Sequence, residues 1–238
     1  MALITGVSSD IGLATARIFV ARGWIVVGTI RSRTRAAELR AIQIDLQMAE
    51  MMKPRDLERV VATAWRTYGR LDALVCCAST GLIGPIDTLD YARMNEQLVV
   101  NTLAPAELAR LVVPLMRRQR YGVIVGVSGL IGRMGLPGYS VLAASKFGLE
   151  GLFESLAMEL VVSRIRVKLV EPSADWAGSG SGRGMPADGV AAAIFRAATD
   201  SRPRLRYPLG QTRWLGYARW LLPERLFLRL LQRVVTGN

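Results

Sequence analysis

Apolar and polar positions divide the chain into short apolar runs and longer segments of helical periodicity, which alternate from end to end. The apolar runs predict strands at residues 2–5, 24–30, 41–44, 73–78, 122–127 and 166–170. Apolar residues that recur every three or four positions predict helices at residues 10–21, 57–68, 91–117, 138–161 and 187–199. Pro105 marks a bend or an offset start within the third of these helices.

The strands indicate the fold class because they are apolar throughout rather than alternating with polar residues. Continuous apolar strands are typical of a parallel sheet that is covered on both faces. Repeated strand–helix units wind such a sheet in both directions from its centre. We therefore expect one α/β domain over residues 1–238, with a single doubly wound, Rossmann-like parallel sheet and helices on both faces.

Residues 213–238 predict a basic amphipathic C-terminal extension. Apolar residues stand at 226, 227, 230, 231, 234 and 235, with arginines at 225, 229 and 233. Such a helix can pack on the domain or on a second subunit, cover an apolar pocket as a lid, or contact a membrane surface. Trp214, Tyr217 and Trp220 precede it and suit the mouth of a pocket for an oily molecule. A homo-oligomer is the expected state.

The composition permits a large core and excludes several kinds of chemistry. Of 238 residues, 51% are hydrophobic and 21% charged. The absence of histidine excludes Ser–His and Cys–His nucleophiles and a His-ligated metal. The only cysteines, Cys76 and Cys77, are adjacent and lack metal-ligand spacing, so no metal is expected. No signal peptide or uncharged run of 18 residues is found, so a cytoplasmic protein without a spanning helix is expected.

The formal net charge of +12 comes almost wholly from arginine. These arginines are scattered over most of the predicted helices, which does not indicate a nucleic-acid site. A basic surface that faces anionic ligands or lipid fits the pattern better. The expected partner is a hydrophobic small molecule, with membrane-surface contact through the C-terminal helix as a further option.

The segment TGVSSDIG, residues 5–12, follows the first predicted strand and leads into a helix. Glycines in such a turn let the backbone approach a phosphate, and the helix N-terminus stabilises its negative charge. Gly6 and Gly12 supply the glycines, and Ser8 and Ile11 lie between them. The pattern predicts a site for the pyrophosphate of a dinucleotide.

The chain resembles the short-chain dehydrogenase/reductase family, in particular its NADP-linked hydroxysteroid, retinol and ketoacyl branch. The resemblance covers nearly the whole chain and rests on TGVSSDIG, VNTLAPAELARLVVPLMR, GVIVGVSGLIGRMGLPG, AASKFGLEGLFESLAMEL and IRVKLVEP. It implies a Rossmann fold, NADP as the cofactor and hydride transfer as the activity. It also implies that Arg31 pairs with a 2′-phosphate and that Asp45 meets the adenine.

Several residues depart from the family pattern where the cofactor would lie. Asp10 replaces the middle glycine of the phosphate loop and adds a carboxylate near two phosphates, although an aspartate there can also cap the helix. Residues 76–79 read Cys-Cys-Ala-Ser where the family has Asn-Asn-Ala-Gly, and Ser173 replaces the glycine after Pro172. We therefore expect NADP to bind weakly or not at all.

Only two of the four residues that transfer hydride in the family are present. Asn101 and Lys146 match the asparagine and the lysine. The tyrosine position, four residues before the lysine, holds Leu142, and the serine position, thirteen residues earlier still, holds Gly129. Loss of a positioned general acid costs ~10²–10⁴-fold in rate, and loss of an oxyanion partner ~10²–10³-fold more. Together these changes remove ordinary carbonyl reduction.

Two neighbours offer replacement hydroxyl groups. Tyr139 shares a helix face with Leu142 only if the helix already runs there; otherwise it packs at the helix entrance. Ser128 lies beside Gly129, but adjacent strand residues point to opposite faces. Lys146 either stabilises an oxyanion or enolate, or remains as a cation bonded to Asn101 or water.

The substrate pocket is expected to be apolar, because leucine and glycine replace two hydroxyl-bearing residues. Its predicted lining is Gly129, Leu142, Ser173 and Trp176. The segment GSGSGRG, residues 178–184, follows the sixth predicted strand and is either a mobile lid or a surface loop.

These departures cluster around the cofactor site, while the hydrophobic periodicity of the core is intact. This favours a stable protein with an altered site over a protein that is losing its fold. The leading hypothesis is a non-redox biosynthetic enzyme of the cyclase or isomerase type, which orients a hydrophobic polycyclic or polyketide-like molecule. One alternative is an NADP-dependent ketone reductase that uses Tyr139 and Lys146. The other is a non-catalytic binding protein or a partner of an active dehydrogenase.

Overall fold

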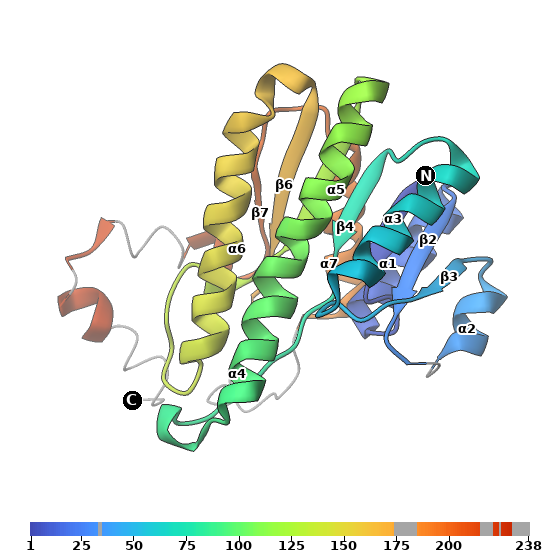
Figure 1. Ribbon diagram of the computed structural model, residues 1–238. Coiled ribbons are helices and arrows are strands. Elements are labelled where there is room, and N and C mark those ends of the chain that lie inside the picture. Colours follow the sequence, from blue (N-terminus) through green and yellow to red (C-terminus); the bar gives the residue numbers. More distant parts are fainter. Residues whose placement is uncertain (33–34, 174–184, 215–220, 224, 230–238) are drawn as a thin grey trace.

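The computed structural model describes residues 1–238 except 33–34, 174–184, 215–220, 224 and 230–238. Its strands are β1 (Ala2–Thr5), β2 (Val26–Ile30), β3 (Asp45–Met48), β4 (Ala73–Cys76), β5 (Gly122–Val127), β6 (Ile165–Glu171) and β7 (Arg206–Pro208). They form one parallel sheet in the order β3-β2-β1-β4-β5-β6-β7 (Figure 1). The chain winds outward from β1 to β3 and then returns to β4. The carboxyl ends of β1 and β4 therefore form the switch point at which such sheets bind ligands.

Helices cover both faces of the sheet. They are α1 (Asp10–Ala21), α2 (Ala36–Ala41), α3 (Pro54–Tyr68), α4 (Tyr91–Leu98), α5 (Ala104–Gln119), α6 (Ser140–Glu159) and α7 (Ala187–Thr199). α3, α5 and α6 pack on one face, and α1 and α7 on the other (Figure 1). The predicted doubly wound α/β fold is confirmed.

Two apolar layers, one on each face of the sheet, make up most of the core. In the first, Phe19 of α1 and Ile194 of α7 pack on alternate residues of β1, β4 and β5. In the second, Leu108 of α5 and Phe153 of α6 pack on the remaining residues of the same strands. Both layers draw on every buried strand, which explains why the strands are continuously apolar.

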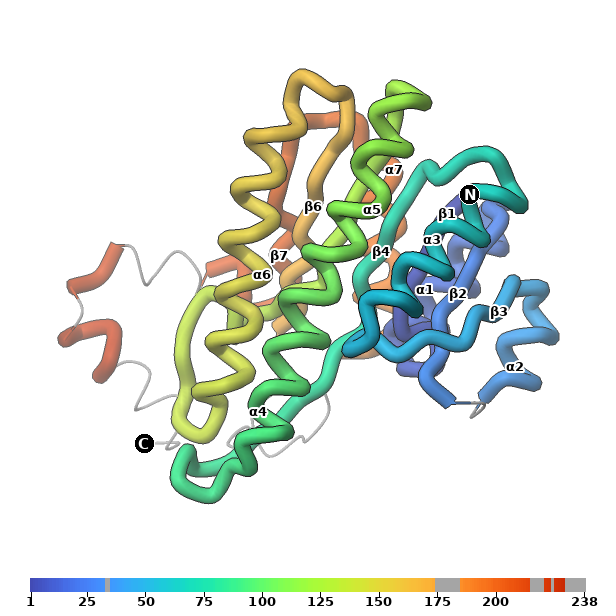
Figure 2. Tube along the Cα trace, in the orientation of Figure 1, coloured from blue at the N-terminus to red at the C-terminus, as the bar shows by residue number. Residues whose placement is uncertain are grey.

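The third predicted strand, residues 41–44, was wrong by four residues. Residue 41 ends α2, Gln43 adopts a left-handed backbone with φ 58°, and β3 begins at Asp45. The apolar run reflects packing instead, because Ile44 is buried and Ile42 partly buried against the core. The short strand β7, which lies beside β6 at the edge of the sheet (Figure 2), was not predicted, since its three residues include Arg206 and a proline.

The long predicted helix at 91–117 is interrupted by a π-helical turn, η2 (Val99–Leu103), between α4 and α5. Asn101 lies in the middle of η2 and is buried. Pro105 stands in the first turn of α5, where a missing backbone N–H costs least, so its predicted offset start is confirmed. Single π turns inside helices are frequent at functional sites.

Tyr91–Gln119 is, within the described residues, the one helical segment long and apolar enough to cross a membrane by length and composition. No such segment was expected from the sequence. Leu108, Val112 and Met116 on this segment are buried against the sheet. A core helix meets the same criteria.

The C-terminal extension contacts the domain through Phe227. This side chain is buried in a third apolar cluster with Leu130, Ile131, Met134, Leu136 and Ala143. Its neighbours Leu226 and Leu228 are about half exposed. Of the roles predicted for the extension, packing on the domain is the one that Phe227 fulfils. Tyr217, Trp220 and the positions from 230 onward lie outside the described residues.

Candidate ligand-binding cleft

Two adjoining cavities open at the carboxyl ends of β1, β4, β5 and β6. The first, of about 240 Å³, extends from the β1–α1 loop toward β2 and the segment after β3. The second, of about 610 Å³, extends from the same loop toward β5, β6 and the start of α6. Ser9, Ser79 and Thr80 line both, so the two form one cleft over the switch point. We call them the loop cavity and the lysine cavity.

The β1–α1 loop keeps the tight geometry of a phosphate-binding turn. Gly6 has φ 68°, and a side chain there would place its Cβ 2.7 Å from Cα of Ala78 on the neighbouring strand end. A Cβ on Gly12 would overlap the Gly6 carbonyl. Gly6 and Ser8 line the loop cavity, and Ile11 lines the lysine cavity. The four residues predicted for this loop are therefore brought together.

Ser9, not Asp10, caps α1. The Ser9 hydroxyl accepts from Gly12 N at 3.1 Å and donates to Gly6 O at 2.8 Å. Asp10 is the first residue of the helix; its carboxylate is 77% exposed and pairs with Arg35 at 2.7 Å. The predicted aspartate cap is thus wrong by one residue. Its charge is offset by a guanidinium that also donates to Ser8 O, which weakens the repulsion expected toward a bound phosphate.

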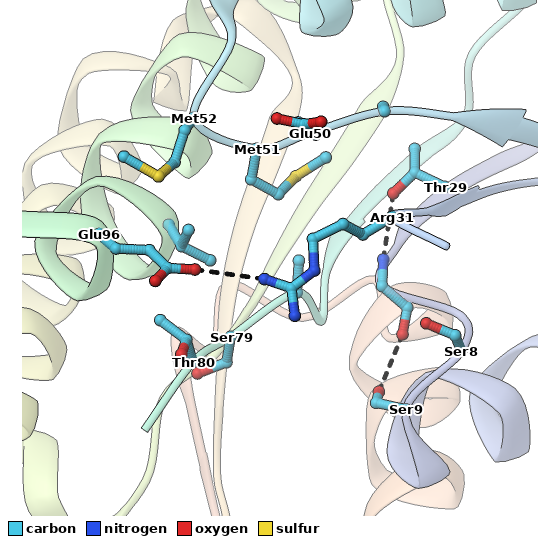
Figure 3. A pocket seen from close by; sticks show the side chains of 14 residues that line it. Ser8, Ser9, Thr29, Arg31, Glu50, Met51, Met52, Ser79, Thr80 and Glu96 are labelled. Carbon is cyan, nitrogen blue, oxygen red and sulfur yellow. Dashed lines mark hydrogen bonds and ion pairs between the residues drawn. The ribbon is translucent and has the colours of Figure 1, made fainter. Parts of the chain in front are cut away.

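Arg31 projects from the end of β2 across the loop cavity (Figure 3). Its guanidinium pairs with Glu96 of α4 at 3.2 Å. The residue predicted to meet a 2′-phosphate is therefore in the cleft but already bonded to a carboxylate. A phosphate at this point would have to displace or approach Glu96, which opposes its binding.

Asp45 is not brought to the cleft. It stands at the start of β3, and its carboxylate accepts from Tyr68 Oη and Gln47. The residues that reach the loop cavity follow the end of the same strand and include Glu50 and Met51 (Figure 3). Sequence reasoning missed them because the third strand was placed four residues too early. Correct strand bounds would have pointed to Glu50.

The lysine cavity contains three of the four residues predicted for the substrate pocket: Gly129, Leu142 and Ser173. The fourth, Trp176, lies outside the described residues, as does the segment 178–184. A Cβ on Gly129 would have only Pro172 O near it, at 3.5 Å, so the missing serine side chain leaves open space. With leucine at 142, the wall near Lys146 is largely apolar.

Lys146 lines this cavity and is otherwise buried. Its ammonium nitrogen donates to the Val127 carbonyl at 3.0 Å. Burial lowers the pKa of Lys146 to about 8. Cys77, which also lines the cavity, has its pKa raised to about 12 by burial, so it is a neutral thiol at physiological pH.

Asn101 holds the cleft in shape rather than lining it. Its side-chain oxygen accepts from Thr80 N at 2.9 Å and from the Ser79 hydroxyl at 3.1 Å. Its amide nitrogen donates to Thr80 O and to Ser145 Oγ. Both amide hydrogens are thereby used within the protein. Asn101 is a positioning residue that ties the segment after β4 to α6.

Tyr139 does not line either cavity. It precedes α6 with φ −112° and ψ 16° and packs, partly buried, on the cluster that holds Leu130, Met134 and Phe227. Leu142 packs on the same cluster, but Leu142 also lines the lysine cavity and Tyr139 does not, so Tyr139 does not replace the missing hydroxyl in the way the reductase alternative requires.

A largely buried ionic cluster that sequence reasoning missed joins β6, α6 and β7. Glu171, at the end of β6, pairs with Arg133 at 3.2 Å and with Arg206 at 3.3 Å, and Arg206 also pairs with Glu150 at 3.3 Å. Burial, together with the charge of Glu150, raises the pKa of Glu171 to about 7. No pattern in the sequence marks these residues as neighbours. Within the described residues, no group of three or more potential ligands could hold a metal ion.

The chain belongs to the short chain dehydrogenase family, whose model matches residues 1–174. Retinol dehydrogenase 8 from Homo sapiens is 37% identical over 178 residues, which cover 71% of this chain and 57% of that protein. The 3-ketodihydrosphingosine reductase of Bacteroides thetaiotaomicron is 32% identical over 171 residues, which cover 71% of this chain and 62% of that protein. The chain therefore spans about three fifths of the length of these curated relatives.

Solved structures of the family superpose on most of the chain. A short-chain dehydrogenase from Streptomyces avermitilis is 26% identical, covers 100% of this chain and 97% of its own, and gives a TM-score of 0.83. A metagenomic short-chain oxidoreductase in complex with NADP is 29% identical, covers 87% of this chain and 94% of its own, and gives a TM-score of 0.75. The fold and the family are thus established together.

A dinucleotide of the kind this family binds would fit the residues present at one end of the cleft only. The loop cavity offers the Gly6 turn and Arg31, although Arg31 is engaged by Glu96. The lysine cavity offers no hydroxyl at positions 129 and 142, where the family places its serine and its tyrosine.

NADPH is expected to bind more weakly than low-micromolar, because Glu96 competes for Arg31. The variant Glu96→Gln should strengthen NADPH binding ~5-fold, which corresponds to about 1 kcal/mol for one exposed charge pair. NADH lacks the 2′-phosphate and serves as the matched control, with no gain expected. Titration calorimetry with both nucleotides measures this. Equal gains for the two nucleotides, or low-micromolar NADPH binding by the unaltered protein, would contradict it.

Proposed function

We propose that this chain is a non-redox member of the short-chain dehydrogenase family. It binds a hydrophobic carbonyl compound in the lysine cavity and promotes isomerisation or cyclisation of that compound. One observation carries the proposal: Gly129 and Leu142 line the cavity together with Lys146, so the cation remains where both hydroxyl groups of the family are missing.

The chemistry follows from the Lys146 side chain. Its ammonium group can donate a hydrogen bond to a substrate carbonyl oxygen, which polarises the C=O bond and stabilises negative charge that develops on that oxygen. The apolar surroundings strengthen this interaction because little water competes for either group. Leu130, Ile131 and Leu142 hold the carbon skeleton in place, and positioning of this kind supplies several kcal/mol toward ring closure or double-bond migration.

A ketone reductase that uses Tyr139 is supported less well. The curated relatives carry the names of a dehydrogenase and a reductase. In this chain, however, Tyr139 packs against the Phe227 cluster outside the cavity lining. A non-catalytic binding protein would use the same cavity and differs from the proposal only in lacking turnover.

Hydrophobic carbonyl compounds are expected to raise the thermal midpoint of the protein without added nucleotide. A ligand that binds only the folded state at 100 times its Kd stabilises by ~2.7 kcal/mol. Leu142→Arg should abolish the shift, because it places a charge in the apolar wall of the cavity. Differential scanning fluorimetry with a panel of aliphatic and polycyclic ketones measures this.

Met158→Arg is the matched control for that substitution. Met158 is on the same helix, α6, but near its other end, and is 70% exposed. The ligand-induced shift should be unchanged in this variant. If NADP stabilises the protein and no apolar ligand does, the cleft is a nucleotide site and the proposal is wrong. If ligands raise the thermal midpoint but none of them is converted to a product, the protein is a binding protein.

A further inference from the structure

Lys146 differs from the other buried lysine in how its nitrogen is hydrogen-bonded. An ammonium group carries three hydrogens and is best stabilised by three acceptors. Lys168 of β6 has three, because it donates to the carbonyls of Arg202 and Arg204 at 2.6 Å and 2.7 Å and to Tyr207 Oη at 3.4 Å. Lys146 has one acceptor in the described part of the chain, the Val127 carbonyl. Its charged form is therefore poorly supported by the protein.

The groups around Lys146 do little to keep it charged. Cys76, at the end of β4, and Cys77, just after it, are electrostatic neighbours of Lys146, and both thiols have their pKa raised by burial, so both are neutral. Glu150 lies one turn further along α6 and pairs with Arg206. Burial outweighs all three and lowers the pKa of Lys146 to about 8. A substantial fraction of the side chain is then a neutral amine just above neutral pH, which is the nucleophilic form.

The surroundings of this amine favour an apolar carbonyl compound. The cavity has a volume of about 610 Å³, and Leu130, Ile131 and Leu142 contribute to its wall. Leu142 stands where the family's tyrosine would be, so that hydroxyl does not bond to the substrate oxygen. An apolar wall also limits the water that would hydrolyse a bond between the amine and the substrate.

The geometry points to Lys146 as a nucleophile that forms an imine with a hydrophobic aldehyde or ketone in the lysine cavity. This deepens the proposed function and rests on it. The neutral nitrogen attacks the carbonyl carbon, the C=O π pair moves to oxygen, and the oxygen takes up the proton that the ammonium released. Loss of water then gives the iminium ion, so ketone and ammonium yield iminium and water. The iminium draws electrons from a neighbouring C–H bond and makes it more acidic, which favours isomerisation without a redox cofactor.

Adducts on lysine can be assigned easily in this protein, because lysine occurs only at positions 53, 146 and 168. We would incubate the full chain with decanal and sodium cyanoborohydride at pH 8 and locate the reduced adducts by peptide mass mapping. Lys53 is exposed, pairs with Glu50 and has a raised pKa. Lys146 should be modified at least about tenfold faster than Lys53, because a much larger fraction of it is unprotonated. Lys146→Met should lose this adduct and leave the labelling of Lys53 unchanged.

A second variant tests whether adduct formation depends on the apolar cavity as well as on the amine. Leu142→Arg should suppress the adduct at Lys146 without affecting Lys53, whereas Met158→Arg should change neither. Adducts confined to Lys53 and the terminal amine in the unaltered protein would overturn the inference. If decanal raises the thermal midpoint but leaves no adduct on Lys146, the imine is excluded while the proposed function stands. If decanal neither binds nor reacts, both fail.

Discussion

The double variant Gly129→Ser, Leu142→Tyr is expected to reduce a model ketone with NADPH at least ~10⁴-fold faster than the unaltered protein, since a general acid is worth ~10²–10⁴-fold and an oxyanion hydrogen bond ~10²–10³-fold. The tyrosine would stand one helical turn before Lys146 on α6. The Cβ atom of the serine would have Pro172 O near it, at 3.5 Å, and the backbone at 129 is extended, so neither space at Cβ nor conformation opposes the substitution. Consumption of NADPH at 340 nm under saturating nucleotide, on the order of ten times its Kd, measures the rate.

Gly129→Ser with Leu142→Phe is the matched control, because it fills the same space without the acidic hydroxyl. It should remain as slow as the unaltered protein. The expectation fails if the unaltered protein already consumes NADPH with the ketone and Tyr139→Phe abolishes that activity. In that case Tyr139 would reach the substrate after all, and the protein would be a reductase.

Lys146→Met is expected to stabilise the fold by up to about 3.5 kcal/mol at pH 7, because the pKa of the buried amine falls from 10.5 to about 8 on folding and each unit corresponds to ~1.4 kcal/mol. The unfolded chain binds more protons at this site between pH 8 and 10.5, so the unaltered protein gains stability as the pH rises through that window. The advantage of the methionine variant should therefore shrink from pH 8 and disappear near pH 10.5. Urea unfolding of both proteins at pH 7, 9 and 10.5 measures this difference in the free energy of unfolding.

Lys53→Met provides the reference for this measurement. Lys53 is exposed and bonded to Glu50 on the surface, and a change there should stay within ~0.5 kcal/mol of the unaltered protein. A Lys146→Met variant that is less stable at every pH would show that the ammonium contributes more through its bond to Val127 O than burial costs it. That result would also remove the chemical basis for a nucleophilic amine.

The sheet could be predicted from the sequence because its strands are buried on both faces and therefore read as unbroken apolar runs. An apolar run does not mark a strand where its residues are buried from a turn or a loop. Ile42 and Ile44 pack on the core from a turn, and β7 is an edge strand whose residues are partly polar. The π turn at 99–103 is invisible to a search for helical spacing, because it changes the spacing itself.

The parts of the site that are formed by residues close together in the sequence could be predicted. Gly6 of the β1–α1 loop lies in the cleft with Gly12 of α1 packed against its carbonyl, and Lys146 and Leu142 line the lysine cavity from one helix face. Long-range pairings could not be predicted. The Arg31–Glu96 pair joins residues 65 positions apart, and the Glu171 cluster joins β6 to segments far away in the sequence. Neither has a spacing that a single sequence can reveal.

The π turn η2 makes the length of the α4–α5 segment part of the site. A π turn carries one residue more than an α turn, so the residues before it are rotated by ~100° from where a regular helix would place them. Gln97 accepts from the backbone of Leu82 on one side of this extra residue, and Asn101 fixes Thr80 within the turn itself. Substitutions along this segment test one side chain at a time, whereas an inserted or deleted residue would change the phase of the helix and misplace both anchors at once.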